Sequence, residues 1–149
     1  MVNVLIILIL LLGPYFGLAP FSLSESVKAR VGITCVFLFT GLGHFLKRQV
    51  MTEMVPRKVP ESWRIPIIYL SGVFEIAMGV LVLVNAWARI VGAVLCIFLV
   101  LVLPANVDSA IRRVPFGGHG AGPIYLLVRI PLQMFLIGWI WQFAIHQIP

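Results

Sequence analysis

Charged residues are scarce in this sequence. They make up 11% of the 149 residues, whereas soluble domains carry about 25%. Apolar residues account for 61% of the chain. This composition excludes an ordinary soluble domain. A chain of this length is expected to form one domain, residues 1–149, folded as a compact helical bundle in a lipid bilayer.

Acidic residues are fewer than basic ones, with 5 Asp and Glu against 11 Lys and Arg and a net charge of +6 at pH 7. A positive charge of this size is typical of nucleic-acid-binding proteins when it gathers on one face. Here the basic residues cluster between apolar segments, a distribution typical of the cytoplasmic loops of membrane proteins. We therefore expect no nucleic-acid partner.

Cysteine is limited to Cys35 and Cys96, both inside apolar segments. Two such residues exclude a disulfide-built scaffold, and they offer no spacing typical of a metal site, so we expect no bound metal. If they are adjacent they form a candidate redox pair, but buried thiols more often behave as small, inert apolar groups.

Long apolar runs dominate the rest of the chain. A helix of about 20 residues rises about 30 Å and so crosses the apolar core of a bilayer. The first run is expected to stay as a helix that Pro14 and Pro20 bend or end, and Ser24 or Ser26 is placed to cap the second. The sequence therefore predicts an all-α, polytopic transmembrane bundle of five helices, at residues 3–21, 27–46, 66–85, 88–104 and 123–145.

The connections between these runs are polar. In segment 47–64, Pro56 and Pro60 argue against a continuous helix, and Trp63 indicates that the segment lies on the membrane surface. Segment 105–122 is rich in glycine and is expected to be a flexible loop. The third and fourth helices are joined so closely that they must be antiparallel neighbours.

The basic residues also predict an orientation. With five helices, one side of the membrane receives the N-terminus and seven basic residues, and the other receives the C-terminus and three. The side with more basic residues is expected to be the cytoplasm. The seven are Lys47, Arg48, Arg57, Lys58, Arg64, Arg112 and Arg113, and the three are Lys28, Arg30 and Arg89.

A single carboxylate, Glu75, lies near the middle of the third predicted helix. An ionisable group at that depth costs about 3 kcal/mol and is retained when it has a partner or a function. At helical spacing Ser71, Gly72 and Gly79 share its stripe, and such small residues indicate that this face packs against protein. The two glycines are suited either to packing inside one subunit or to a homodimer.

Polar residues of three other helices are expected to meet Glu75 in the cytoplasmic half of the bundle. His44 ends the second helix, Asn106 closes the fourth, and Arg129 is the natural ion-pair partner of Glu75. Either these groups bind a ligand head group or move a proton, or they form a buried pair that only fixes helix packing, with Asn106 as a helix terminator. The candidate ligand-binding residues are Glu75, Arg129, His44, Asn106, Ser71 and, on the same helical face as Arg129, Tyr125 and Gln133.

Four motifs resemble those of the DoxX-like family of small integral membrane proteins. In chain order they are GLGHF at 41–45, MVP at 54–56, YLSGVFEIAMGVLVL at 69–83 and PAN at 104–106. The motif carboxylate of the family corresponds to Glu75 and its motif histidine to His44. The resemblance implies a four-helix bundle, with one N-terminal helix added here, and we expect it in a bacterial cell (inner) membrane. The count of basic residues predicts an N-terminus in the cytoplasm.

The resemblance and the polar residues together predict binding of a quinone or another amphipathic small molecule, as an accessory of a redox system. No pattern for haem, iron–sulfur or flavin binding is present, so redox chemistry would need a borrowed or diffusible cofactor, for which quinone is the candidate. The alternatives are a chaperone or assembly subunit that contacts a membrane partner protein, and a small proton-coupled transporter that uses Glu75. No motif identifies an enzyme.

Overall fold

The computed structural model describes residues 2–18 and 22–146. Within them the chain forms helices and no strand, so the predicted all-helical class is confirmed, whereas the predicted number of five helices is wrong. The α-helices are six: α1 (Val2–Gly13), α2 (Glu25–Leu46), α3 (Arg48–Met54), α4 (Glu61–Leu81), α5 (Asn85–Ile111) and α6 (Leu126–Ile140). Three short turns complete them: π-helices η1 (Pro14–Leu18) and η3 (Trp141–Ile145), and the 3-10 helix η2 (His119–Tyr125).

Four helical stretches are long and apolar enough to cross a membrane: Glu25–Leu46, Glu61–Leu81, Asn85–Ile111 and His119–Ile145. The predicted first span, 3–21, is not among them, since its apolar helix covers only Asn3–Gly17. The regular helix α1 gives way to a π-turn at Pro14, whose ring leaves no amide to donate. Pro20 and Phe21 of that predicted span lie outside the described residues.

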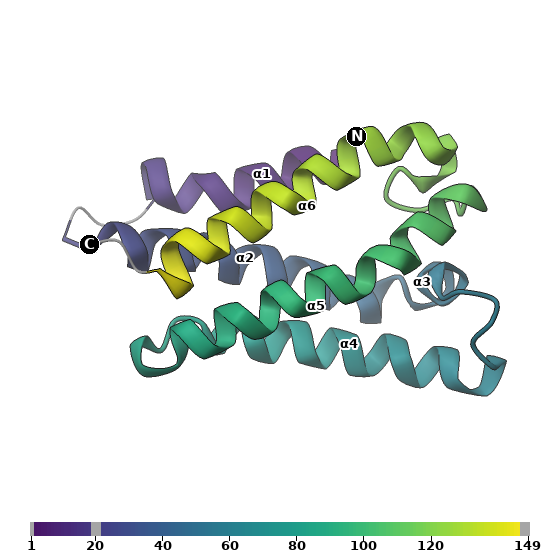
Figure 1. Cartoon of the computed structure of the whole chain (residues 1–149), viewed down its shortest axis with the longest axis horizontal. Helices are drawn as coiled ribbons and strands as arrows, with labels where there is room; N and C mark the ends of the chain where they lie inside the picture. The colour runs from purple at the N-terminus through teal and green to yellow at the C-terminus, as the bar shows by residue number, and fades with distance from the viewer. Residues whose placement is uncertain (1, 19–21, 147–149) are drawn as a thin grey trace.

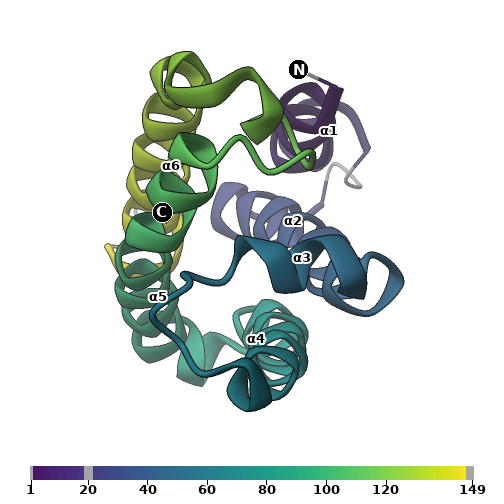
Figure 2. The same cartoon turned by 90° about the vertical axis from the view of Figure 1, so that its right-hand side faces the viewer.

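The long helices lie side by side along one axis of the molecule (Figure 1). α4 and α5 are antiparallel neighbours joined by the turn at residues 82–84, as the sequence predicts. Seen from the end where α3 lies, α1, α2 and α4 occupy one side of the bundle, and α5 and α6 occupy the other (Figure 2). The two sides face each other across the interior, where the site described below lies.

α2 and α4 pack most closely, because glycine lies at their crossing. A Cβ at Gly72 would come 2.8 Å from the Cβ of His44, and one at Gly79 would come 2.8 Å from the Cβ of Phe37. Both distances are shorter than side chains tolerate, so only glycine permits this approach. Gly72 and Gly79 therefore pack against α2 inside one subunit, and these glycines give no support to a homodimer.

The most fully buried apolar side chains include Leu11, Ile33, Leu95 and Ile140, with no exposed surface. They come from α1, α2, α5 and α6 and belong to one cluster that also includes Val82 beside the α4–α5 turn. This core fills the half of the bundle nearer that turn. Arg30 and Thr34 are also buried near that end, and the other half contains the buried His44, Asn106, Ser109 and His119.

α5 runs to Ile111, seven residues beyond the predicted end at Pro104. A proline inside a helix removes one backbone hydrogen bond and usually ends the helix. Here the next two turns bury Asn106, Ser109 and Ala110 against their neighbours, and this packing keeps the helix regular. The prediction that Asn106 closes the helix is therefore wrong, and segment 105–122 is only partly a loop.

Segment 47–64 contains the short helix α3, which the sequence did not predict. It ends at Met54, two residues before Pro56, so the breaks that the prolines indicated are where they were expected. At the start of α2, the backbone amide of Val27 donates to Ser24 Oγ at 3.4 Å. Of the two predicted capping residues, Ser24 is thus the one used.

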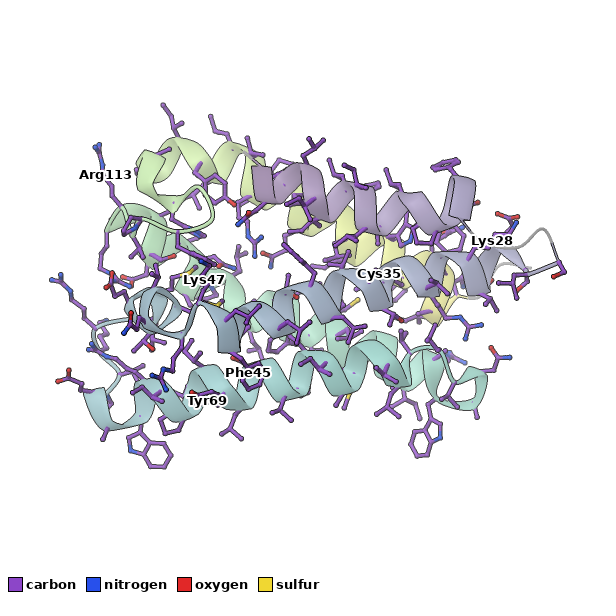
Figure 3. All side chains as sticks on the ribbon, turned by 180° about the vertical axis from the view of Figure 1, so that it is seen from behind. Lys28, Cys35, Phe45, Lys47, Tyr69 and Arg113 are labelled. Atoms are coloured by element: carbon purple, nitrogen blue, oxygen red, sulfur yellow. The ribbon has the colours of Figure 1, made fainter. Side chains whose placement is uncertain are left out.

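The basic residues divide between the two ends of the bundle. Lys47 and Arg113 lie near one end and Lys28 near the other (Figure 3). α1 begins toward the first end, and the last described turn, η3, lies at the second (Figure 1). This division agrees with the predicted topology, while the side of a membrane that each end faces stays a prediction.

Candidate functional site

A cavity of about 730 Å³ lies in the half of the bundle toward α3, and all six α-helices contribute to its lining. Most of the lining is apolar, with side chains such as Phe37, Phe98, Leu99 and Leu132. The seven residues predicted from the sequence all line it: His44, Ser71, Glu75, Asn106, Tyr125, Arg129 and Gln133. The structure thus brings them together, and their binding of a ligand stays a prediction.

One wall of the cavity, formed by α2 and α4, carries a connected polar network. Glu75 is buried, and its Oε1 lies 3.1 Å from His44 Nε2. Its second oxygen, Oε2, accepts a hydrogen bond of 2.5 Å from Thr40 Oγ1. On the far side of the imidazole, His44 Nδ1 lies 3.1 Å from the Ile68 carbonyl and 3.0 Å from Ser71 Oγ.

The imidazole of His44 can bond its neighbours in two ways. Where Nδ1 carries hydrogen it donates to the Ile68 carbonyl, and the bond between Nε2 and Glu75 then needs a second proton, on Nε2 or on the carboxyl group. Where Ser71 Oγ donates to Nδ1 instead, Nε2 carries the hydrogen and donates to an ionised Glu75. In each arrangement one hydrogen bond joins His44 to Glu75 beside the cavity.

The predicted pair between Glu75 and Arg129 is wrong. Ion pairs among the described residues join Lys28 to Glu25, His44 to Glu75, and Arg112 to Asp108. The close approach of α2 and α4 at Gly72 delivers His44 to the carboxylate first. Arg129 belongs to α6, on the other wall of the cavity.

The wall formed by η2 and α6 contains polar atoms that lack partners. Arg129 Nε, His119 Nε2 and Gln133 Oε1 are buried and make no hydrogen bond. His119 Nδ1 donates to the Phe116 carbonyl at 2.8 Å, and Gln133 Nε2 donates to the Leu99 carbonyl at 2.5 Å. Those bonds orient both side chains and leave their remaining polar atoms at the cavity.

Two residues of the site were not among the predicted set. Thr40 lies one turn before His44, and that spacing was the signal that could have identified it. His119 follows a pair of glycines with positive φ, and a Cβ at Gly118 would come 2.4 Å from the Tyr125 ring. The tight backbone holds His119 against Tyr125, with ring centroids 4.8 Å apart, and no sequence spacing predicts that contact.

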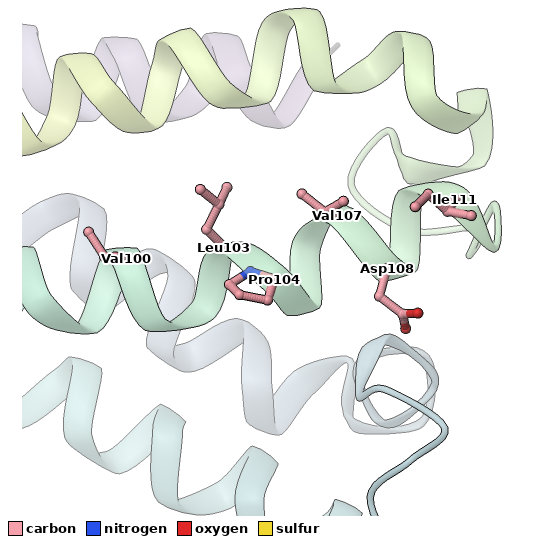
Figure 4. A pocket seen from close by; sticks show the side chains of 6 residues that line it. All are labelled: Val100, Leu103, Pro104, Val107, Asp108 and Ile111. Atoms are coloured by element: carbon pink, nitrogen blue, oxygen red, sulfur yellow. The ribbon is translucent and has the colours of Figure 1, made fainter.

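A hollow on the surface of α5 is a poorer candidate site. It has a volume of about 520 Å³ and lies along α5, where the side chains that line it are mostly apolar (Figure 4). Its single carboxylate, Asp108, is already paired with Arg112 at 2.8 Å. In the described part of the chain, no three His, Cys, Asp or Glu residues lie together so as to hold a metal ion.

Residues 33–144 match the family model described as "Domain of unknown function (DUF8561)". The chain belongs to this family. All seven predicted residues lie inside the matched region, whereas α1 precedes it. No curated protein and no solved structure matches the chain. The family description names no activity, so the resemblance to DoxX-like proteins stays a prediction.

Proposed function

We propose that this DUF8561 protein is an integral membrane protein that binds an amphipathic small molecule in the cavity between α2, α4, α5 and α6. The four long apolar stretches support the membrane location. A cavity of about 730 Å³ with a mostly apolar lining is the size and character of a small-molecule site. The head group would lie among the polar residues and the tail along the apolar ones.

The observation that carries the proposal is that three of the five buried side-chain polar atoms without partners in the described residues line this cavity: Arg129 Nε, His119 Nε2 and Gln133 Oε1. Each such atom costs about 1–3 kcal/mol when it lacks a hydrogen bond, and few groups in a protein are left so. A polar head group in the cavity would satisfy them.

A quinone is one ligand within this class, because its carbonyl oxygens can accept from Arg129. In that case the protein would serve a redox system as the membrane accessory that the sequence predicts. A second candidate function, proton-coupled transport, is supported by the hydrogen-bonded pair of two titratable groups, His44 and Glu75, beside the cavity. Both uses begin with binding in the same cavity.

Native mass spectrometry of the protein purified in a mild nonionic detergent tests the proposal. The wild-type chain should retain a small molecule that dissociates on activation. Leu132→Trp, which puts a larger side chain into the cavity, should lose it. The matched control is Leu70→Trp, on the exposed face of α4 and outside the cavity, which should keep it. Equal retention by both variants would overturn the proposal.

A further inference from the structure

We infer that the head group of this ligand is an anion, a carboxylate or a phosphate, and that Arg129 is the residue that holds it. The inference rests on the proposed function and adds that the ligand head group is negatively charged. It follows from the balance of charge around the cavity, from the state of the Arg129 side chain and from the position of a second cation.

The charges that line the cavity do not cancel. Among the described residues of its lining, Arg129 and Lys47 are cations and Glu75 is the one carboxylate. Glu75 is already bonded to His44 and Thr40. With Glu75 ionised and both lining histidines neutral the net charge of the lining is +1, and a proton on any of these three groups makes it more positive. The cavity is therefore positive in every arrangement of the His44–Glu75 bond.

Arg129 carries the part of this charge that is hardest to leave uncompensated. The residue is partly buried. Its Nε is buried without an acceptor, and no carboxylate of the described residues lies within 4.0 Å of its guanidinium. A partly buried charge without a partner is more costly than a neutral group in the same place. An anionic oxygen would provide both the acceptor and the opposite charge, and a guanidinium suits a carboxylate or a phosphate because it donates in a planar fork.

A neutral head group would satisfy only half of this requirement. A quinone carbonyl or an alcohol would accept the hydrogen bond from Arg129 but would leave its charge uncompensated. The acceptors beside it, Gln133 Oε1 and the neutral His119 Nε2, would bond a head-group hydroxyl or a water shared with the anion.

The surroundings of Arg129 fit an anion attached to an apolar chain. Leu132 and Leu136 follow it on α6, and Leu99 lines the cavity from α5, so a tail would find an apolar path next to the head group. Lys47 is exposed and lines the cavity directly after α2, where its charge would attract an anion on entry.

The experiment compares amphiphiles with similar tails and different heads. Dodecanoate and dodecyl phosphate are the anionic probes, and dodecanol and a decyl-benzoquinone are the neutral ones. Each is titrated below its micellar concentration into ligand-stripped protein in nonionic detergent, at a pH at which both acids are ionised. Bound adducts are counted by native mass spectrometry. At least one anionic probe should bind about tenfold more tightly than either neutral probe.

Variants assign the preference to Arg129. Arg129→Met removes the charge and should reduce the preference to about threefold or less, whereas Arg129→Lys, which keeps the charge, should retain most of it. Lys58→Met lowers the net charge equally at an exposed position outside the cavity and should change nothing. Preference for dodecanoate alone or dodecyl phosphate alone would identify which anion is bound.

The outcomes separate this inference from the proposed function. Equal or tighter binding of the neutral probes by the wild-type chain, abolished by Leu132→Trp, would overturn the anionic head group while the binding cavity stands. An anionic preference that survives in Arg129→Met would overturn the role of Arg129. Binding of no probe by the wild-type chain would count against both, and this comparison does not depend on how the variants fold.

Discussion

His44 Nε2 and Glu75 Oε1 lie 3.1 Å apart, so the buried carboxylate of α4 is balanced by an imidazole of α2. The pair joins the two helices that pack most closely in the bundle, and it borders the cavity. Removing one member leaves the other buried without its partner, whereas removing both leaves an apolar contact. That asymmetry makes the pair testable by stability alone.

Glu75→Leu should destabilise the protein by about 3–5 kcal/mol, because it leaves His44 with one bonding nitrogen unsatisfied. His44→Leu combined with Glu75→Leu should recover most of that loss. Thermal unfolding in detergent measures both. Arg129→Leu serves as the control, and its effect on stability should be the same in the wild-type and Glu75→Leu backgrounds. A larger stabilisation in the Glu75→Leu background would mean that Arg129 is the true partner of Glu75.

The crossing of α2 and α4 gives a second prediction. Gly72→Ala would place a Cβ 2.8 Å from His44 Cβ and 2.9 Å from the Phe45 ring, so the helices must separate. The expected loss is about 1–3 kcal/mol, together with weaker ligand binding because His44 moves. Gly138→Ala is the matched control, since a Cβ there meets nothing within 4 Å, and alanine should slightly stabilise the helix. Equal stability of the two variants would contradict the close crossing.

Local patterns were enough to predict the four long apolar helices and the polar faces of α4 and α6. Glu75, Ser71 and the glycines share one stripe, and Tyr125, Arg129 and Gln133 recur every four residues, so their directions follow from helical spacing. The partner of Glu75 could not be predicted in this way. Distances between helices depend on which residue lies at each crossing, and the approach at Gly72 favours His44 over the longer Arg129.

Errors at the ends of helices have a similar cause. Pro104 is a local signal to stop, but the buried contacts of Asn106 and Ser109 come from other helices and outweigh it. The helix α3 was missed because its carbonyls are satisfied from far along the chain. Arg112 donates to the carbonyls of Glu53 at 2.8 Å and Met54 at 3.3 Å.

This contact predicts that Arg112 holds α3 over the cavity. Met51 and Met54 of α3 line the cavity, and Arg112 is itself fixed by Asp108 at 2.8 Å. Arg112→Met should free the C-terminal end of α3 and increase amide hydrogen exchange in residues 48–55 about tenfold or more. Lys58→Met, in the linker that follows, should leave that exchange unchanged. Unchanged exchange in Arg112→Met would show that other contacts hold α3.

The proposed membrane topology predicts that the two ends of the bundle are reached from opposite sides. The experiment uses a background with Cys35→Ala and Cys96→Ala. The thiol of Lys58→Cys should react only with a reagent that reaches the cytoplasm, because residue 58 lies at the end of the bundle that holds seven of the basic residues. The thiol of Arg89→Cys, exposed at the start of α5, should react with a reagent that is added outside the cell and cannot cross the membrane. Labelling sealed cells and inverted vesicles with an impermeant maleimide measures both.

Reversed labelling would invert the orientation and keep the fold. It would also place the cavity end, with Lys47 and α3, outside the cytoplasm. Labelling of both positions from one side would contradict a bundle whose long helices cross the membrane, since α4 alone separates residue 58 from the turn before α5.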